Sequence, residues 1–270
     1  MSLRNNSERL GAHPTSEAPA PAFAENQFSF VLPTMFVELP SKGEFYLEGH
    51  PLHGLDAVEI RMMTAKDEDL LTNPDLIKKK VVLDRLIQSL LVDKRLRVDD
   101  LLVGDKNAIL VAARILGYGK DYEFTIGDTT HTLDLTQIEN KEIDESLFNS
   151  GKNEFSYTLP HTDTNLTFKL LTHGDEKKIQ KEIAGIKKLN NSNPEGSTRL
   201  KYIITSVADS REPKDIREFV DNYLLAKDAR EFRKYVLKIQ PDVDLTFFPD
   251  DGGEAVAIPI GISFFYPDLD

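Results

Sequence analysis

Few residues of this sequence have the types and spacing that chemistry requires. His50 and His53 form an H-x-x-H pattern beside Glu48, and such side chains are common zinc ligands. Two glycines and a proline interrupt this stretch, so we expect a loop rather than a helix that presents both rings. No third ligand follows nearby, and the chain has no cysteine that could supply a thiolate or a nucleophile. The sequence therefore predicts no metal site here.

Gly104-Asp105-Lys106 superficially resembles a phosphate-binding loop. That motif needs a further glycine upstream and a serine or threonine after the lysine, and neither is present. We interpret Asp105 instead as the cap of a core helix over residues 107–116. The acidic run 250–254 lacks the alternating ligand spacing of a calcium loop and is interpreted as a turn. No G-x-S-x-G element is present, so we expect no enzyme, no cofactor and no catalytic residue.

The elements around these residues predict an α+β fold. Thr64 and Asn73-Pro74 have the sequence features of helix starts, and the apolar spacing from Leu76 to Leu91 predicts one long amphipathic helix. Alternating residues predict β-hairpins over 122–135 and 155–171. Helices are expected from about Asp175, then over 198–206, 214–224 and 227–239. A long apolar strand is expected over 255–265.

The predicted organisation is two lobes of short β-hairpins and amphipathic helices with a disordered N-terminal arm. Residues 1–26 are rich in Ser, Asn, Ala and Pro, which bury too little surface to order by themselves. Residues 27–150 are expected to form an N-terminal α+β lobe. Residues 151–270 are expected to form a C-terminal α+β lobe with a helical segment and a terminal β-hairpin. Whether the arm orders on a partner is left open.

Composition limits the functional class. Of the 270 residues, 40% are hydrophobic and 29% charged, which is typical of a globular protein. The formal net charge of -12 argues against a role in wrapping nucleic acid. No apolar run is long enough to span a membrane, and no secretory signal is recognisable, so we expect a cytosolic setting without nucleic acid or membrane as partner. The lysine-rich helix 177–188 carries interleaved glutamates and is interpreted as a solvated face, with an acidic partner surface as the alternative.

Several short patterns follow one another in a fixed order along the chain. The match that they belong to extends over most of the chain after about Phe36. The patterns are Pro40-Ser41-Lys42-Gly43 followed by Tyr46, Arg61-Met62 with Thr64-Ala65-Lys66-Asp67, Val103-Gly104-Asp105-Lys106-Asn107-Ala108, Tyr118-Gly119-Lys120-Asp121-Tyr122 and Phe264-Phe265-Tyr266-Pro267-Asp268.

In these patterns the chain resembles the baseplate hub assembly proteins of contractile-tailed bacteriophages. The resemblance implies a non-enzymatic structural protein of the virion tail baseplate, present in the host cytoplasm during assembly. It would bind other hub proteins or the tape-measure protein, and a homo-oligomer is a further alternative. A transient chaperone that leaves before the particle matures is a second alternative, and an enzyme with an unrecognised site is a third.

Some relatives in that family carry cysteine pairs in two turns, but residues 126–129 and 249–252 hold none, so no thiolate zinc site is implied here. Two segments are candidates for docking to a partner. The first is a turn whose lysine we expect to be exposed, although a purely structural turn is an equal alternative. The second is the apolar end of the chain. The candidate docking residues are Pro40, Ser41, Lys42, Gly43, Tyr46, Phe264, Phe265 and Tyr266.

Overall fold

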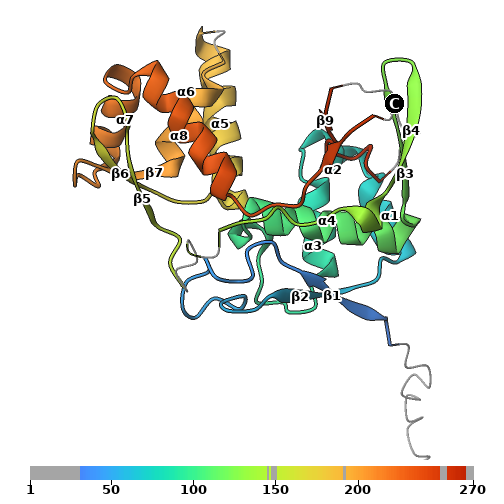
Figure 1. The fold of residues 1–270 in the computed structure, drawn as a ribbon. Helices are drawn as coiled ribbons and strands as arrows, with labels where there is room; N and C mark the ends of the chain where they lie inside the picture. Colours follow the sequence, from blue (N-terminus) through green and yellow to red (C-terminus); the bar gives the residue numbers. More distant parts are fainter. Residues whose placement is uncertain (1–30, 145, 147–150, 191–192, 250–253, 266–270) are drawn as a thin grey trace, which may run out of the picture. The chain divides into compact units, whose positions relative to one another are not determined.

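The structure is a computed structural model that describes residues 31–144, 146, 151–190, 193–249 and 254–265 (Figure 1). The chain divides into two units, Met1–Leu32 and Pro33–Asp270, and the second carries all the elements described below. Helices and several small antiparallel sheets make it an α+β protein, as predicted. The expected arm over residues 1–26 lies outside the described residues.

The first sheet pairs β1 (Thr34–Glu38) with β2 (Ala57–Arg61) in antiparallel register. A series of turns from Pro40 connects them, and Gly43 has a φ of +71° that favours glycine. A Cβ atom at Gly43 would lie 2.4 Å from the carbonyl oxygen of Leu55, so no larger residue fits. The predicted turn at 40–43 is confirmed.

Three short helices follow: α1 (Ala65–Leu71), α2 (Pro74–Lys78) and α3 (Val82–Leu90). Thr64 and Asn73 cap the first two, as their sequence positions predict. The single long helix predicted from the apolar spacing is wrong, because the chain leaves helical geometry between α2 and α3. Lys80 adopts a φ of +55° there. Because the apolar stripe continues across the break, the apolar spacing alone could not reveal that the helix is interrupted.

Helix α4 (Val103–Tyr118) is the central core helix, preceded by the short 3₁₀ helix η1 (Val98–Asp100). It begins four residues earlier than predicted, so Asp105 lies inside its first turn and does not cap it. Gly119 ends it with a φ of +86°. Its N-terminal turn packs tightly against the chain, because a Cβ atom at Gly104 would lie 2.0 Å from the carbonyl oxygen of Pro241.

Two hairpins form where alternation predicted them. Strands β3 (Asp121–Ile126) and β4 (Thr129–Asp134) pair across the Gly127-Asp128 turn, and η2 (Leu135–Gln137) follows. Strands β5 (Phe155–Thr158) and β6 (Asn165–Phe168) form the second hairpin.

A third strand, β7 (Ile204–Val207), joins β6 and completes a three-stranded sheet. It replaces the last three residues of the helix predicted over 198–206. Its apolar and β-branched residues fit a strand as well as a helix, so only their pairing with β6 decides between the two.

Four helices surround this sheet region: α5 (His173–Asn190), α6 (Glu195–Ile203), α7 (Pro213–Asn222) and α8 (Ala226–Ile239). Phe232 of α8 packs edge-on against Phe168 of β6, with ring centroids 5.1 Å apart. The helices predicted over 214–224 and 227–239 are confirmed as α7 and α8.

The end of the described chain packs on the first half of the protein. Strands β8 (Thr246–Phe247) and β9 (Val256–Ala257) are two residues long, so the strand predicted over 255–265 is mostly wrong. Asn107 of α4 donates a 3.0 Å hydrogen bond to Asp242. Residue 150 therefore does not separate two independent lobes, because the segment after α8 returns to α4.

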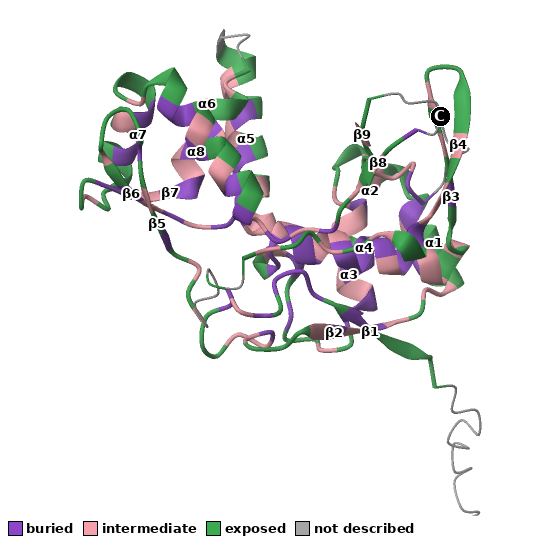
Figure 2. Ribbon diagram, viewed as in Figure 1, coloured by how far each residue is buried: buried purple, intermediate pink, exposed green. Residues whose placement is uncertain are grey.

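The apolar core extends from β1 through α4 to α8, and Figure 2 shows buried residues on the inner faces of these helices. In the described part of the chain, no helix is long and apolar enough to cross a membrane.

Candidate functional site

The turn predicted to dock a partner is largely buried. Pro40, Ser41, Gly43 and Tyr46 are buried, and Lys42 alone among the turn's four predicted residues is exposed. The docking interpretation is therefore wrong for these buried side chains. The hydrogen-bond partners of Ser41 and Tyr46 lie inside the protein, more than fifty residues away in sequence.

The buried carboxylate of Asp105 accepts hydrogen bonds from Ser41 and Tyr46. The backbone N–H of Ser41 donates to Oδ1 of Asp105 over 3.0 Å, and the Ser41 hydroxyl donates to Oδ2 over 2.6 Å. The Tyr46 hydroxyl donates to the same Oδ2 over 2.7 Å and accepts from the N–H of Leu102 over 3.1 Å. We call Ser41, Tyr46 and Asp105 the buried node. It fastens the β1–β2 connection to the start of α4.

Electrostatics at the buried node favour structure over catalysis. Burial raises the pKa of the Asp105 carboxyl, although hydrogen bonds from Ser41 and Tyr46 partly oppose this shift. The pKa of the Tyr46 hydroxyl is raised well above 10.0 by burial and by the nearby Asp105 charge. All three residues are buried, and the polar atoms of the node are joined to one another by hydrogen bonds.

The apolar candidates near the end of the chain are also core residues. Phe264 and Phe265 are 0% and 1% exposed, and Nε of Arg114 donates to the Phe264 carbonyl over 2.9 Å. Docking through these two rings is therefore wrong, because they already pack on Tyr122 and Tyr118. Tyr266 lies outside the described residues.

The H-x-x-H histidines hold their own loop together. His50 stacks on Tyr46 with ring centroids 4.5 Å apart, and its Nδ1 accepts from the N–H of Leu52 over 3.1 Å. Burial lowers the pKa of His50. Nδ1 of His53 donates to the Tyr46 carbonyl over 2.7 Å. Neither ring is arranged as a metal ligand with the other.

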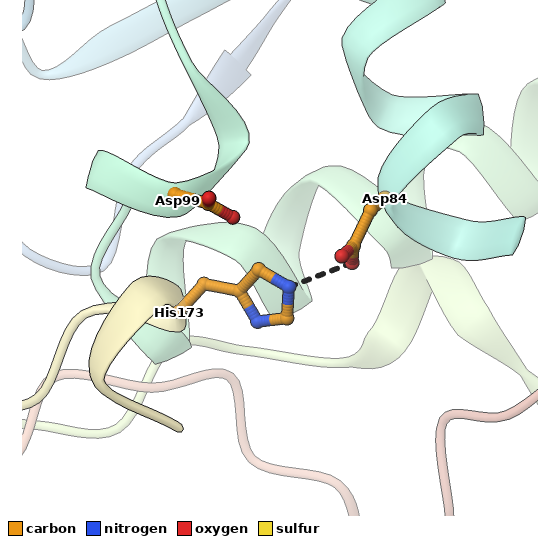
Figure 3. A group of neighbouring side chains, drawn as sticks. All are labelled: Asp84, Asp99 and His173. Carbon is orange, nitrogen blue, oxygen red and sulfur yellow. Dashed lines mark hydrogen bonds and ion pairs between the residues drawn. The ribbon is translucent and has the colours of Figure 1, made fainter. Parts of the chain in front are cut away.

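A different set of polar side chains converges between α3, η1 and α5. Asp84, Asp99 and His173 place one ligand-type atom each within 4.8 Å of one another (Figure 3). Nε2 of His173 lies 2.6 Å from Asp84. The ammonium of Lys177 lies 3.3 Å from Asp84 and 2.8 Å from Asp99. We call these four residues the Asp–His cluster.

The Asp–His cluster fits an internal ion-pair network better than a metal or catalytic centre. Lys177 already supplies the cation that both carboxylates need. Nδ1 of His173 accepts from Lys106 over 3.2 Å, so its other nitrogen, which faces Asp84, carries the proton. Neither nitrogen is therefore free to serve as a general base.

The charges around Asp84 keep its carboxylate ionised. Burial opposes this, but the His173 hydrogen bond and the charges of Lys106 and Lys177 lower the pKa of Asp84 overall.

No local pattern could have found this cluster. Its acidic members are separated from His173 by 89 and 74 residues, and two aspartates are unremarkable in a chain with 45 acidic residues. The side chain of His173 is only 12% exposed, and nothing in the sequence around it signals this burial.

The lysine-rich helix α5 is more than a solvated face. Glu176 accepts two hydrogen bonds from Arg199 of α6, and Glu182 accepts two from Arg217 of α7. Arg217 lowers the pKa of Glu182 to about 2. The glutamates interleaved among the lysines thus fasten α5 to its neighbours, and most of the lysines stay exposed.

A pocket of about 550 Å³ opens where the first turns of α4 and α5 meet α6 and α8. Basic groups dominate its polar lining, although the whole chain carries a net charge of -12. Its lining residues are Val103, Lys106, Lys169, Leu171, His173, Glu176, Arg199, Ile203, Arg233, Val236, Leu237 and Gln240.

No family model matches the chain, and no curated protein or solved structure matches it either. The fold and these sites define an α+β protein in which most of the candidate polar residues form hydrogen bonds and ion pairs within the chain.

Proposed function

We propose that this chain is a non-enzymatic structural or assembly protein of a phage tail baseplate hub that acts by binding other proteins. The resemblance in its short sequence patterns supplies the baseplate setting. The packing of the chain supplies support for a binding role.

The observation that carries the proposal is the edge strand β1. Its sheet has two strands, and β2 is flanked on its other side by Leu91 and Val92. Among the described residues no strand pairs with the outer edge of β1. Phe36 is 70% exposed in that strand. An edge strand with an exposed aromatic side chain is a ready template for pairing with a partner strand.

The buried node makes this edge rigid. Ser41 lies three residues after the end of β1, and Asp105 holds it from the start of the core helix. The sequence pattern that carries the resemblance therefore includes residues that fix the exposed strand. A rigid edge loses little entropy when a partner docks, which favours binding.

Two aspects of this function stay open alternatives. A partner strand on β1 could belong to a hub protein, to the tape-measure protein or to a second copy of the chain. The protein could stay in the particle or act as a transient chaperone. One experiment addresses both the identity of the partner and the fate of the protein.

The experiment compares Phe36→Asp with Phe248→Asp in infected cells. Phe248 is 68% exposed, so the control places the same charge on an equally exposed ring away from β1. Quantitative mass spectrometry of purified particles and of cell complexes then follows the chain. We expect the Phe36→Asp chain to be absent from particles and from cell complexes with tail proteins, and the Phe248→Asp chain to stay in them.

Presence of the wild-type chain in mature particles supports a baseplate component, and its presence in cell complexes alone supports a chaperone. A wild-type chain found with no tail protein overturns the proposal. Complexes containing only this chain, shown by size-exclusion chromatography with light scattering, would make the partner a second copy.

A further inference from the structure

The pocket between α4, α5, α6 and α8 holds two cations, Lys106 and Arg233, that form no direct ion pair among the described residues. Lys169 pairs with Asp175, and Arg199 pairs with Glu176. In contrast, neither Lys106 nor Arg233 has a carboxylate within ion-pair distance among the described residues. Lys106 is partly buried, and burial lowers its pKa. The charges of Asp84 and Glu176 partly offset this shift without forming a direct ion pair with Lys106. An anion in direct contact with Lys106 and Arg233 would therefore stabilise the charged form of Lys106 further.

The lining of the pocket fits a carboxylate that is flanked by apolar groups. Glu176 also lines the pocket, and its charge is paired with Arg199. A carboxylate placed between Lys106 and Arg233 would therefore face two cations, and Arg199 would limit repulsion from Glu176. Arg233 can supply the paired N–H groups that carboxylates accept.

Apolar residues surround these cations. Val103, Leu171 and Ile203 line the pocket wall, so a ligand should carry apolar groups beside its charge. The lining extends along α8 to Leu237, which is 67% exposed one turn after Arg233. A free small anion would leave that leucine unused, but a peptide segment would cover it.

We propose that this pocket binds a carboxylate side chain of a partner protein, presented by a segment in which acidic and bulky apolar residues alternate. Arg233 and Lys106 hold the carboxylate, and the apolar wall together with Leu237 receives the neighbouring side chains. This inference rests on the proposed function, because it assigns the chemistry of one partner segment. It concerns a surface separate from β1.

The test uses the full chain labelled with ¹⁵N and the peptide acetyl-Leu-Glu-Leu-Glu-amide as probe. Amide chemical shifts are followed during titration, with acetyl-Leu-Gln-Leu-Gln-amide, sodium acetate and inorganic phosphate in parallel. Arg233→Gln is the main variant because Arg233 is exposed and its replacement leaves the core intact. Arg85→Gln removes the same charge from an exposed site on α3 that does not line the pocket. Lys106→Met tests the second cation.

We expect the acidic peptide to shift amides of the pocket residues and to bind more tightly than its glutamine counterpart. Arg233→Gln should weaken this binding by about tenfold, the lower end of the range for one charge-assisted hydrogen bond, and Arg85→Gln should leave it unchanged. Lys106→Met should also weaken it while the amide spectrum stays dispersed.

Three outcomes overturn the inference. Equal binding of both peptides would show that charge is not recognised. Acetate that binds as tightly as the acidic peptide would show a free small carboxylate as ligand, and tighter phosphate would show a phosphate site. Failure here leaves the baseplate proposal standing if Phe36→Asp removes the chain from tail complexes, so the two failures are distinguishable.

Discussion

The hydroxyl of Tyr46 and the carboxylate of Asp105 lie 2.7 Å apart in the protein core, although 59 residues separate them in sequence. Asp105 accepts three hydrogen bonds at this point, two from Ser41 and one from Tyr46. The arrangement joins the turn after β1 to the first turn of α4. It converts two separate sequence patterns into one structural unit.

Replacement of Asp105 by Asn should destabilise the protein at neutral pH by about 1–3 kcal/mol. The amide group would face the Tyr46 and Ser41 hydroxyls with a donor where the carboxylate accepts. Urea unfolding at pH 7 measures the change. Tyr46→Phe is the matched variant, and it should lose about 1 kcal/mol because it removes one donor from Asp105 and one acceptor from Leu102.

Wild type and Asp105→Asn together also test the protonation of Asp105. The folded-state pKa of Asp105 lies above the ordinary 3.8, so the folded state holds the proton more tightly than the unfolded state. The stability advantage of wild type over Asp105→Asn should therefore be largest below pH 3.8 and shrink as pH rises through the folded-state pKa. An advantage that grows with pH over this range would contradict the assignment.

Local chemistry explains which parts of the fold the sequence could predict. The caps at Thr64 and Asn73 depend on residues two or three positions away, and the hairpin turn at Gly127 depends on its immediate neighbours. The break at Lys80 was missed because the apolar stripe on either side of it keeps helical spacing. The end of α4 was predicted better than its start, because Gly119 marks it.

The sites could not be predicted in the same way. Asp105 looked like a helix cap because its partners, Ser41 and Tyr46, are far away in sequence. Phe264 was interpreted as a docking residue because its burial depends on Arg114 and Tyr122 from the other half of the chain. Only tertiary packing decides whether such polar and aromatic residues face a partner or the core.

Asp67 provides a second stability test with the opposite pH dependence. Its carboxylate is buried, but bidentate hydrogen bonds from Arg61 and one from Ser89 outweigh burial and hold its pKa well below 3.8. Asp67→Asn should cost about 2–4 kcal/mol at pH 7, since it leaves the Arg61 charge without its partner. Chemical denaturation of both proteins measures this difference.

The contribution of Asp67 should be complete above the unfolded-state pKa near 3.8 and should disappear as pH falls through the lower folded-state pKa. The gap between wild type and Asp67→Asn should therefore narrow in acid. Asp69→Asn, an exposed change in the same helix, serves as control and should show a small effect at every pH.

Gly104 should be intolerant of a side chain. Its added Cβ atom would lie 2.0 Å from the Pro241 carbonyl oxygen, so α4 and the segment after α8 would have to separate. We expect Gly104→Ala to destabilise the protein by about 1–3 kcal/mol despite the better helix propensity of alanine. Thermal unfolding measures the loss. Gly185→Ala is the control: its Cβ atom meets nothing within 4 Å in exposed α5, and it should stabilise by about 0.5–1 kcal/mol.

Lys177 should block metal binding at the Asp–His cluster. Its ammonium contacts both Asp84 and Asp99 and is 45% exposed, so its removal should change stability little. We expect Zn²⁺ to leave the melting temperature of the wild type unchanged and to raise that of Lys177→Ala, where two carboxylates and His173 are released as ligands. Lys181→Ala controls for the lost charge. A wild-type melting temperature that rises with Zn²⁺ would contradict the ion-pair assignment.

The packing of Phe264 predicts that the last described segment is required for folding. Its ring is 0% exposed and lies 4.9 Å from the Tyr122 ring, measured between centroids. Phe264→Ala should therefore destabilise by about 3–5 kcal/mol through the cavity it leaves, as calorimetry or urea unfolding can measure. Phe248→Ala removes the same ring from a site that is 68% exposed and should change stability by less than about 0.5 kcal/mol.

Deletion of all residues after Gly253 should abolish soluble folded protein, because it removes β9 and both buried phenylalanines and leaves Arg114 without its carbonyl acceptor. A soluble truncation with a dispersed amide spectrum would show that α4 and β3 form their core without this segment.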